Sequence, residues 1–185
     1  ADQTIGPLKY KQQVLGMAGQ GGADADPVSL VQHIVPPGQQ AKVISDIGKA
    51  KHITENYENI MKYYDQAEKD LSSPITKPQY TLNPFLDPPS IKALKAALIP
   101  IAHDEIGRVN PEALHAFHEL LPGRAEFSST QKADREAFKK LLMNQYTEAV
   151  NSVKAHNIDL RNYASTNPVR NALKKAGPNA EAMLM

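Results

Sequence analysis

The sequence predicts an all-α protein in which two long antiparallel helices are joined by a proline-rich strap and short helices. Three observations support this prediction. Apolar residues recur at steps of three and four in two long segments, which is the spacing of one helix face. Asp-Pro or Asn-Pro pairs precede the short segments, as they do at helix starts. No stretch of useful length alternates between apolar and polar residues as a strand would.

Residues 1–38 are predicted to be a flexible N-terminal segment with short helices. Gly19, Gly21 and Gly22 lie close together, and such glycine clusters mark irregular chain. A short helix is expected over 8–17. Asp26 and Pro27 are expected to open another through Ile34, which the Pro-Pro-Gly sequence at 36–38 ends.

The first long helix is predicted over 39–72, within a helical domain that spans 39–165. Its apolar residues fit the a and d positions of a heptad, interrupted by Asp46: Val43, Ala50, Ile53, Tyr57, Ile60, Tyr64, Ala67 and Leu71. The same pattern arises whether the seam closes within one chain or between two chains. Both alternatives stay open at this point.

A proline-rich insertion over 73–89 follows the first long helix. Five prolines exclude a regular helix or a central strand there. Apolar residues between the prolines, including Tyr80 and Phe85, indicate a strap packed on a helical surface. Short helices are predicted over 90–122, the second of them opened by Asn110 and Pro111.

The second long helix is predicted over 129–163. Ser128 and Gln131 match a capping box at its start. Its apolar stripe contains Phe138, Leu142, Tyr146, Ala149, Val153, His156, Leu160 and Tyr163. Residues 166–185 are predicted to form a C-terminal short helix, opened by Asn167 and Pro168, and a tail.

Composition excludes several classes of function. The 21 Lys and Arg residues nearly balance the 20 Asp and Glu residues, which disfavours nucleic acid as a partner. The absence of Cys excludes disulfides, thiolate metal ligands and cysteine nucleophiles. The longest apolar run, 96–102, is far shorter than the about 20 residues of a transmembrane helix.

No catalytic pattern is present in the sequence. It has no Gly-x-Ser-x-Gly elbow and no phosphate-binding loop. We therefore predict that the protein is not an enzyme and has no cofactor.

Tyrosines suggest the candidate interaction residues. Tyrosine suits interfaces because it offers both apolar area and a hydroxyl group. The predicted interface residues are Tyr57, Tyr64, Tyr80, Phe85 and Tyr146. The alternative is that the tyrosines fill a core that has few Leu and Phe residues.

Three histidines are the candidate ligands of an alternative metal site. His115 and His118 lie one helical turn apart, and His103 precedes their helix closely. Two imidazoles at this spacing can share a metal ion. The alternative is that they flank the apolar face of Leu114, Phe117 and Leu121, and no metal is assigned.

One family resemblance spans about residues 26–163. The sequence at 26–35, the Ile-Ser-Asp-Ile-Gly sequence at 44–48 and the Tyr-containing sequence at 55–64 are similar to minor pilus subunits of type IV secretion and conjugation systems. The resemblance implies export after signal cleavage and a role in adhesion or assembly. The long helix has more Lys and Glu than Gln, and the C-terminus lacks a Gln/Ala-rich repeat. No site residue is transferred from this family.

The expected function is that of a non-enzymatic exported helical protein that acts through protein–protein interaction, as a component of a secretion or conjugation apparatus. Its partners would be other proteins, including assembly subunits. Whether the chain forms an oligomer is left open by the sequence. A second hypothesis is a structural subunit of a filament, virus-like coat or organelle complex, and a third is a helical metal or cofactor carrier. The start at Ala1 fits either signal cleavage or loss of Met. The expected location is the periplasm or the cell surface, with the cytoplasm as the alternative.

Overall fold

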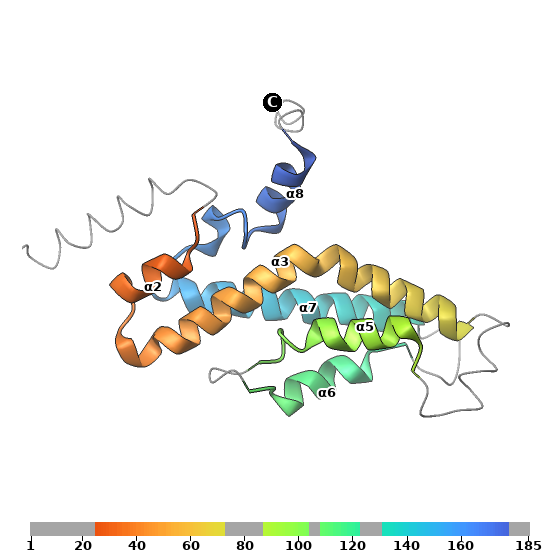
Figure 1. Cartoon of the computed structure of the whole chain (residues 1–185). Coiled ribbons are helices and arrows are strands. Elements are labelled where there is room, and N and C mark those ends of the chain that lie inside the picture. Colours follow the sequence, from red (N-terminus) through yellow and green to blue (C-terminus); the bar gives the residue numbers. More distant parts are fainter. Residues whose placement is uncertain (1–24, 73–86, 104–107, 123–130, 178–185) are drawn as a thin grey trace, which may run out of the picture. The chain divides into compact units, whose positions relative to one another are not determined.

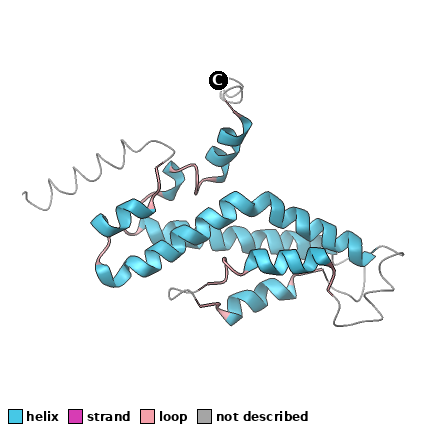
Figure 2. Cartoon of the chain, in the orientation of Figure 1, coloured by secondary structure: helices cyan, strands magenta, loops and turns pink. Residues whose placement is uncertain are grey.

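A computed structural model describes residues 25–72, 87–103, 108–122 and 131–177 of the chain. These residues form six α-helices and no strand, which confirms the all-α prediction (Figures 1 and 2). The helices are α2 (Val28–Ile34), α3 (Pro37–Ser72), α5 (Pro89–Leu98), α6 (Pro111–Glu119), α7 (Gln131–Lys154) and α8 (Pro168–Ala176), with one 3-10 turn, η1 (Leu160–Asn162). The antiparallel pairing of the two long helices stays a prediction. The predicted strap lies almost wholly outside the described residues.

The chain divides into two compact units, each of which is described by itself. One contains residues 1–55 and 148–185, and the other contains residues 56–147. Both α3 and α7 contribute residues to each unit. The helical domain over 39–165 stays a prediction.

The residue types at the first positions of several helices explain where those helices begin. The side chain of Asn110 accepts hydrogen bonds from the backbone N–H groups of Glu112 and Ala113, and Asn167 does the same for α8. These bonds satisfy N–H groups that have no partner within the first turn. Pro37 begins α3 two residues before the predicted start, because proline at the first helical position loses no hydrogen bond there.

The predicted seam on α3 is confirmed as a buried face. Seven of its eight residues are buried, and only Tyr57 is half-buried. Ile47, Thr54 and Met61 are buried as well. The buried face is therefore wider than a two-position heptad seam, as expected for a helix in a globular unit rather than a coiled coil.

The second long helix is shorter than predicted. It ends at Lys154, and Asn157 adopts a left-handed conformation with φ of 64° before η1. Asn tolerates this conformation better than most residues. Leu160 and Tyr163 are nevertheless buried. The apolar period thus identified buried residues correctly, but it did not show where the helix breaks.

The unit formed by 1–55 and 148–185 has an aliphatic core and a buried side-chain hydrogen bond. Val31, Val43, Ile47 and Ile53 are buried, as are Val153, Ile158 and Leu160. The buried hydroxyl of Thr166 donates a hydrogen bond to the carbonyl oxygen of Leu160 at 2.6 Å. This bond links two residues of the irregular segment that follows α7.

The unit formed by 56–147 is built around three aromatic side chains. Tyr64 and Phe138 lie 4.7 Å apart between ring centroids, and Phe117 meets Phe138 edge-on at 5.7 Å. All three side chains are fully buried. The hydroxyl of Tyr64 donates a hydrogen bond of 2.8 Å to the carbonyl oxygen of Leu120, so α3, α6 and α7 are joined at one point.

The short helix α5 packs against the end of α3 in the same unit. Ala67, Leu71 and Ile91 form a buried cluster. The hydroxyl of Ser90 donates a hydrogen bond of 2.7 Å to a carboxylate oxygen of Asp70. Asp87, two residues before the start of α5, accepts a hydrogen bond from the ammonium group of Lys95 at 2.7 Å.

Replacing Tyr64→Phe is expected to lower the free energy of unfolding by about 1 kcal/mol, because the carbonyl of Leu120 loses a buried partner while the packing is kept. Tyr63→Phe is the matched control, since Tyr63 is the neighbouring residue and is 36% exposed. Urea unfolding followed by circular dichroism measures both. Equal effects of the two substitutions would contradict the role given to the Tyr64 hydroxyl.

Two buried threonines are expected to respond in opposite ways to replacement by valine. The hydroxyl oxygen of Thr54 is buried and has no hydrogen-bond partner among the described residues. Thr54→Val should therefore stabilise its unit by about 1 kcal/mol. Thr166→Val should destabilise it by about 1–3 kcal/mol, because the Leu160 carbonyl is left without that bond. Thermal or urea unfolding gives the sign for each variant.

Candidate functional site: a charged groove between α3 and α7

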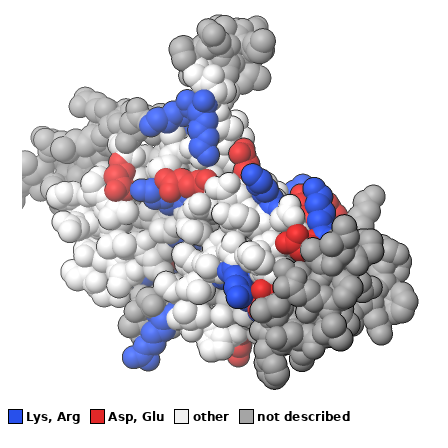
Figure 3. All heavy atoms as spheres, turned by 45° about the vertical axis from the view of Figure 1, so that its right-hand side comes forward, with Lys and Arg blue, Asp and Glu red and all other residues white. Residues whose placement is uncertain are grey.

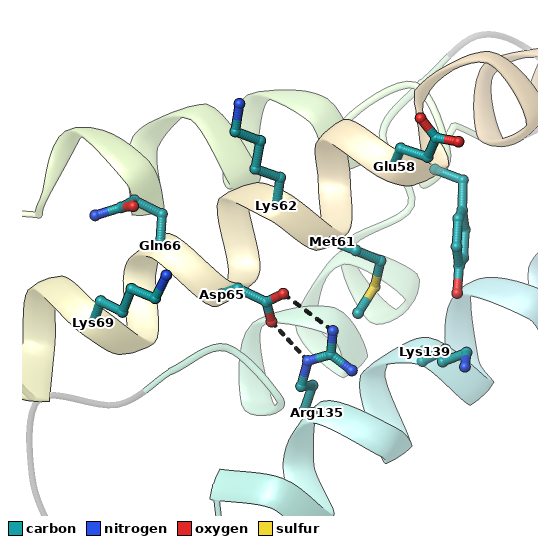
Figure 4. Close-up of a pocket in the computed structure, with 9 residues that line it drawn as sticks. Glu58, Met61, Lys62, Asp65, Gln66, Lys69, Arg135 and Lys139 are labelled. Carbon is teal, nitrogen blue, oxygen red and sulfur yellow. Dashed lines mark hydrogen bonds and ion pairs between the residues drawn. The ribbon is translucent and has the colours of Figure 1, made fainter.

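A groove of about 450 Å³ lies between α3 and α7 within the unit formed by 56–147. On α3 its lining includes Glu58, Lys62, Asp65 and Lys69. These residues follow one another at steps of three and four, so they share one side of the helix. From α7, Arg135 and Lys139 line the groove one turn apart. In Figure 4 Arg135 points toward Asp65, whereas Lys62 points away from α7.

An ion pair crosses this groove. Arg135 donates two hydrogen bonds to the carboxylate of Asp65, from Nε to Oδ1 at 2.6 Å and from Nη2 to Oδ2 at 3.1 Å (Figure 4). The bidentate geometry fixes the direction of both side chains. The hydrogen bond from Arg135 lowers the pKa of Asp65 below its ordinary value, so the carboxylate is charged at neutral pH.

The remaining charges in the groove are mainly positive. Four basic residues (Lys62, Lys69, Arg135 and Lys139) and two acidic ones (Glu58 and Asp65) line it, a net charge of +2. Lys62 and Lys139 are exposed and form no ion pair with other described residues. The groove is thus a basic site on a chain with a net charge of only +1.

Two largely apolar side chains, Met61 and Tyr57, also line the groove. The side chain of Met61 points from α3 into the space between the two helices (Figure 4) and is only 7% exposed. Tyr57, a predicted interface residue, is half-buried and lines the same groove. A ligand could therefore contact apolar surface and basic groups together.

The other predicted interface residues lie elsewhere. Tyr64 is fully buried in the aromatic cluster, so for this residue the structure favours the core alternative over a partner contact. Tyr146 is a half-buried residue of α7 outside the groove lining. Tyr80 and Phe85 lie outside the described residues.

The three candidate metal ligands do not form a ligand set. The described part of the chain contains no group of three or more His, Asp or Glu residues that could hold a metal ion. His115 forms a 3.1 Å contact with Glu119, with both side chains exposed, while His103 is half-buried in an isolated bridge with Val109. Burial, with Lys95 and His115 nearby, lowers the pKa of His118. A neighbouring ammonium group also opposes binding of a second cation.

The ion pair between Asp65 and Arg135 was not predicted from the sequence. Asp65 and Arg135 are separated by 70 positions, and no local pattern links them. The one local signal was their position beside the predicted apolar stripes. Asp65 directly follows Tyr64, and Arg135 precedes Phe138 by three positions.

Comparisons with known proteins give no assignment: no protein-family model, curated protein or solved structure matches this chain. Among the described residues, no helix combines the length and apolar character needed to cross a membrane. The resemblance to minor pilus subunits stays a prediction.

The Asp65–Arg135 pair is expected to stabilise the unit modestly and to depend on pH. Both side chains are about one-third exposed or more, so a double-mutant cycle with Asp65→Asn and Arg135→Gln should give a coupling energy of about 0.5–1 kcal/mol at neutral pH. Because the pKa of Asp65 is lowered on folding, this contribution is present above the ordinary value of 3.8 and is lost as the pH falls below it.

Urea unfolding of the four proteins over a series of pH values, from neutral to well below 3.8, measures this coupling. A coupling energy that stays constant as the carboxylate is protonated would contradict the assignment to an ion pair.

Proposed function

We propose that the protein acts as a non-enzymatic binding protein whose charged groove docks an acidic segment of a partner protein. The observation that carries the proposal is the position of Lys62 and Lys139. They stand on opposite sides of a groove whose central cation, Arg135, is already neutralised by Asp65. A carboxylate-bearing ligand would give both lysines a counter-charge.

The ion pair has a second role in this proposal. It joins α3 to α7 beside the lysines, and it thereby holds the two helices at a set distance before a ligand arrives. Preorganisation of this kind improves affinity because less motion is lost on binding. Met61 and Tyr57 supply apolar contact surface below the charges. The groove is small, so we expect a short peptide segment rather than a folded surface as its ligand.

The cellular setting is part of the same proposal. We infer a role in a secretion or conjugation apparatus, with export to the periplasm or the cell surface and with assembly subunits as partners. The support for this setting is the resemblance of residues 26–163 to minor pilus subunits. An acidic segment on a neighbouring subunit would be the ligand of the groove.

Charge reversal at Lys139 tests the groove directly. A fluorescent peptide that contains several Asp and Glu residues and one Leu serves as the probe, with binding followed by anisotropy. Lys139→Glu should weaken binding by about tenfold, because it replaces attraction by repulsion. Lys140→Glu is the matched control: it is also exposed, it follows on the same helix, and it does not line the groove.

Binding should also weaken as the salt concentration rises, because exposed charges are screened. The proposal is contradicted if Lys139→Glu and Lys140→Glu weaken binding equally, or if the wild-type protein does not bind the acidic peptide more tightly than a peptide with Gln and Asn in place of the acids.

A further inference from the structure

Helix α8 separates its apolar and basic residues clearly. At about 100° per residue, Val169, Ala172, Leu173 and Ala176 fall within one face about 100° wide. Arg170, Lys174 and Lys175 lie outside this face, and the helix contains no acidic residue. It is therefore a short amphipathic helix with a charge of +3.

The apolar face of this helix is only partly covered by the rest of the chain. A surface helix normally buries its apolar face, yet no residue of α8 is buried: Val169 is 68% exposed, Ala172 and Ala176 are exposed, and Leu173 is half-buried. On the polar side, Asn171 donates a hydrogen bond of 3.2 Å from Nδ2 to the backbone oxygen of Thr54 on α3. Asn171 lies about 150° around the helix from the centre of the apolar face.

Basic residues border the exposed apolar face on both sides. Arg170 lies about 60° beyond Leu173, and Lys175 lies about 60° beyond Ala172. Long basic side chains in such positions can keep their charges in water while their stems cover apolar surface. Basic side chains gather over the helix that leads to the C-terminal residues (Figure 3).

We propose that α8 is a docking surface for an anionic membrane, in which the apolar face enters the boundary between headgroups and acyl chains and the basic residues contact anionic lipids. Charge complementarity selects this partner. The apolar residues are aliphatic and include no aromatic anchor of the kind that dominates protein interfaces. Two copies of a helix with a charge of +3 would repel each other, which disfavours self-association through this face. The attachment would be peripheral and reversible.

Co-sedimentation of the full chain with vesicles tests this surface. Vesicles of phosphatidylcholine alone are compared with vesicles of phosphatidylcholine and phosphatidylserine. We expect binding to the anionic vesicles only, weakened by salt. Removing two charges with Arg170→Gln and Lys175→Gln should weaken binding by about 25-fold, at about fivefold for each charge near the surface.

Substitution of the apolar face provides the decisive control. Val169→Asp should abolish vesicle binding without affecting the fold, since Val169 is exposed. Ile44→Asp, at another exposed apolar residue of the same unit, should bind as the wild type does. The proposal is overturned if the wild type does not bind anionic vesicles at low salt, if it binds neutral vesicles equally, or if Val169→Asp leaves binding unchanged.

A dimer that Val169→Asp dissociates would also overturn the proposal, because the face would then belong to a second copy. Lys139→Glu should leave vesicle binding intact. The failure of the membrane proposal and the failure of the groove proposal are therefore distinguishable.

Discussion

Burial of one face of α3, from Val43 to Leu71, is the constraint on which both units of the chain depend. In the unit formed by 1–55 and 148–185, this face supplies Val43, Ile47 and Ile53 to an aliphatic core. In the unit formed by 56–147, its continuation supplies Ile60 and Tyr64. A small helical protein has few other large apolar side chains, and this chain has no Trp and only four Phe. Burial of this face therefore contributes to the core of each unit, together with residues such as Phe138 and Leu160 outside α3.

The position of the charged groove follows from this burial. Tyr64 and Phe138 are fixed in the core by their ring contact. Asp65 is the next residue after Tyr64, and Arg135 lies one turn before Phe138, so both stand at the edge of the same core. Lys139 directly follows Phe138 and is exposed. The aromatic cluster thus determines where the ion pair forms and where the lysines of the groove stand.

The sequence predicted burial better than it predicted backbone path or pairing. The apolar period on α3 and the Asn caps at 110 and 167 are local signals, and the structure confirms them. The end of α7 was missed because Leu160 and Tyr163 keep the helical period, although Asn157 breaks the helix before them. The Asp65–Arg135 pair joins positions far apart in the chain, and no spacing rule identifies such a pair. For Tyr64, the aromatic type was equally consistent with a core and with an interface, and only the packing distinguishes them.

A polar contact lies at each of the two surfaces proposed to bind partners. Asp65 and Arg135 form an ion pair across the groove, and Asn171 links α8 to the backbone oxygen of Thr54. If an apolar residue stood at position 171, the helix would gain from turning an apolar face toward α3. With Asn171 bonded to Thr54, Val169 is 68% exposed and Leu173 is half-buried. Amphipathicity read from the sequence gives the width of a face but not its direction, and here the direction determines which surface is available for binding.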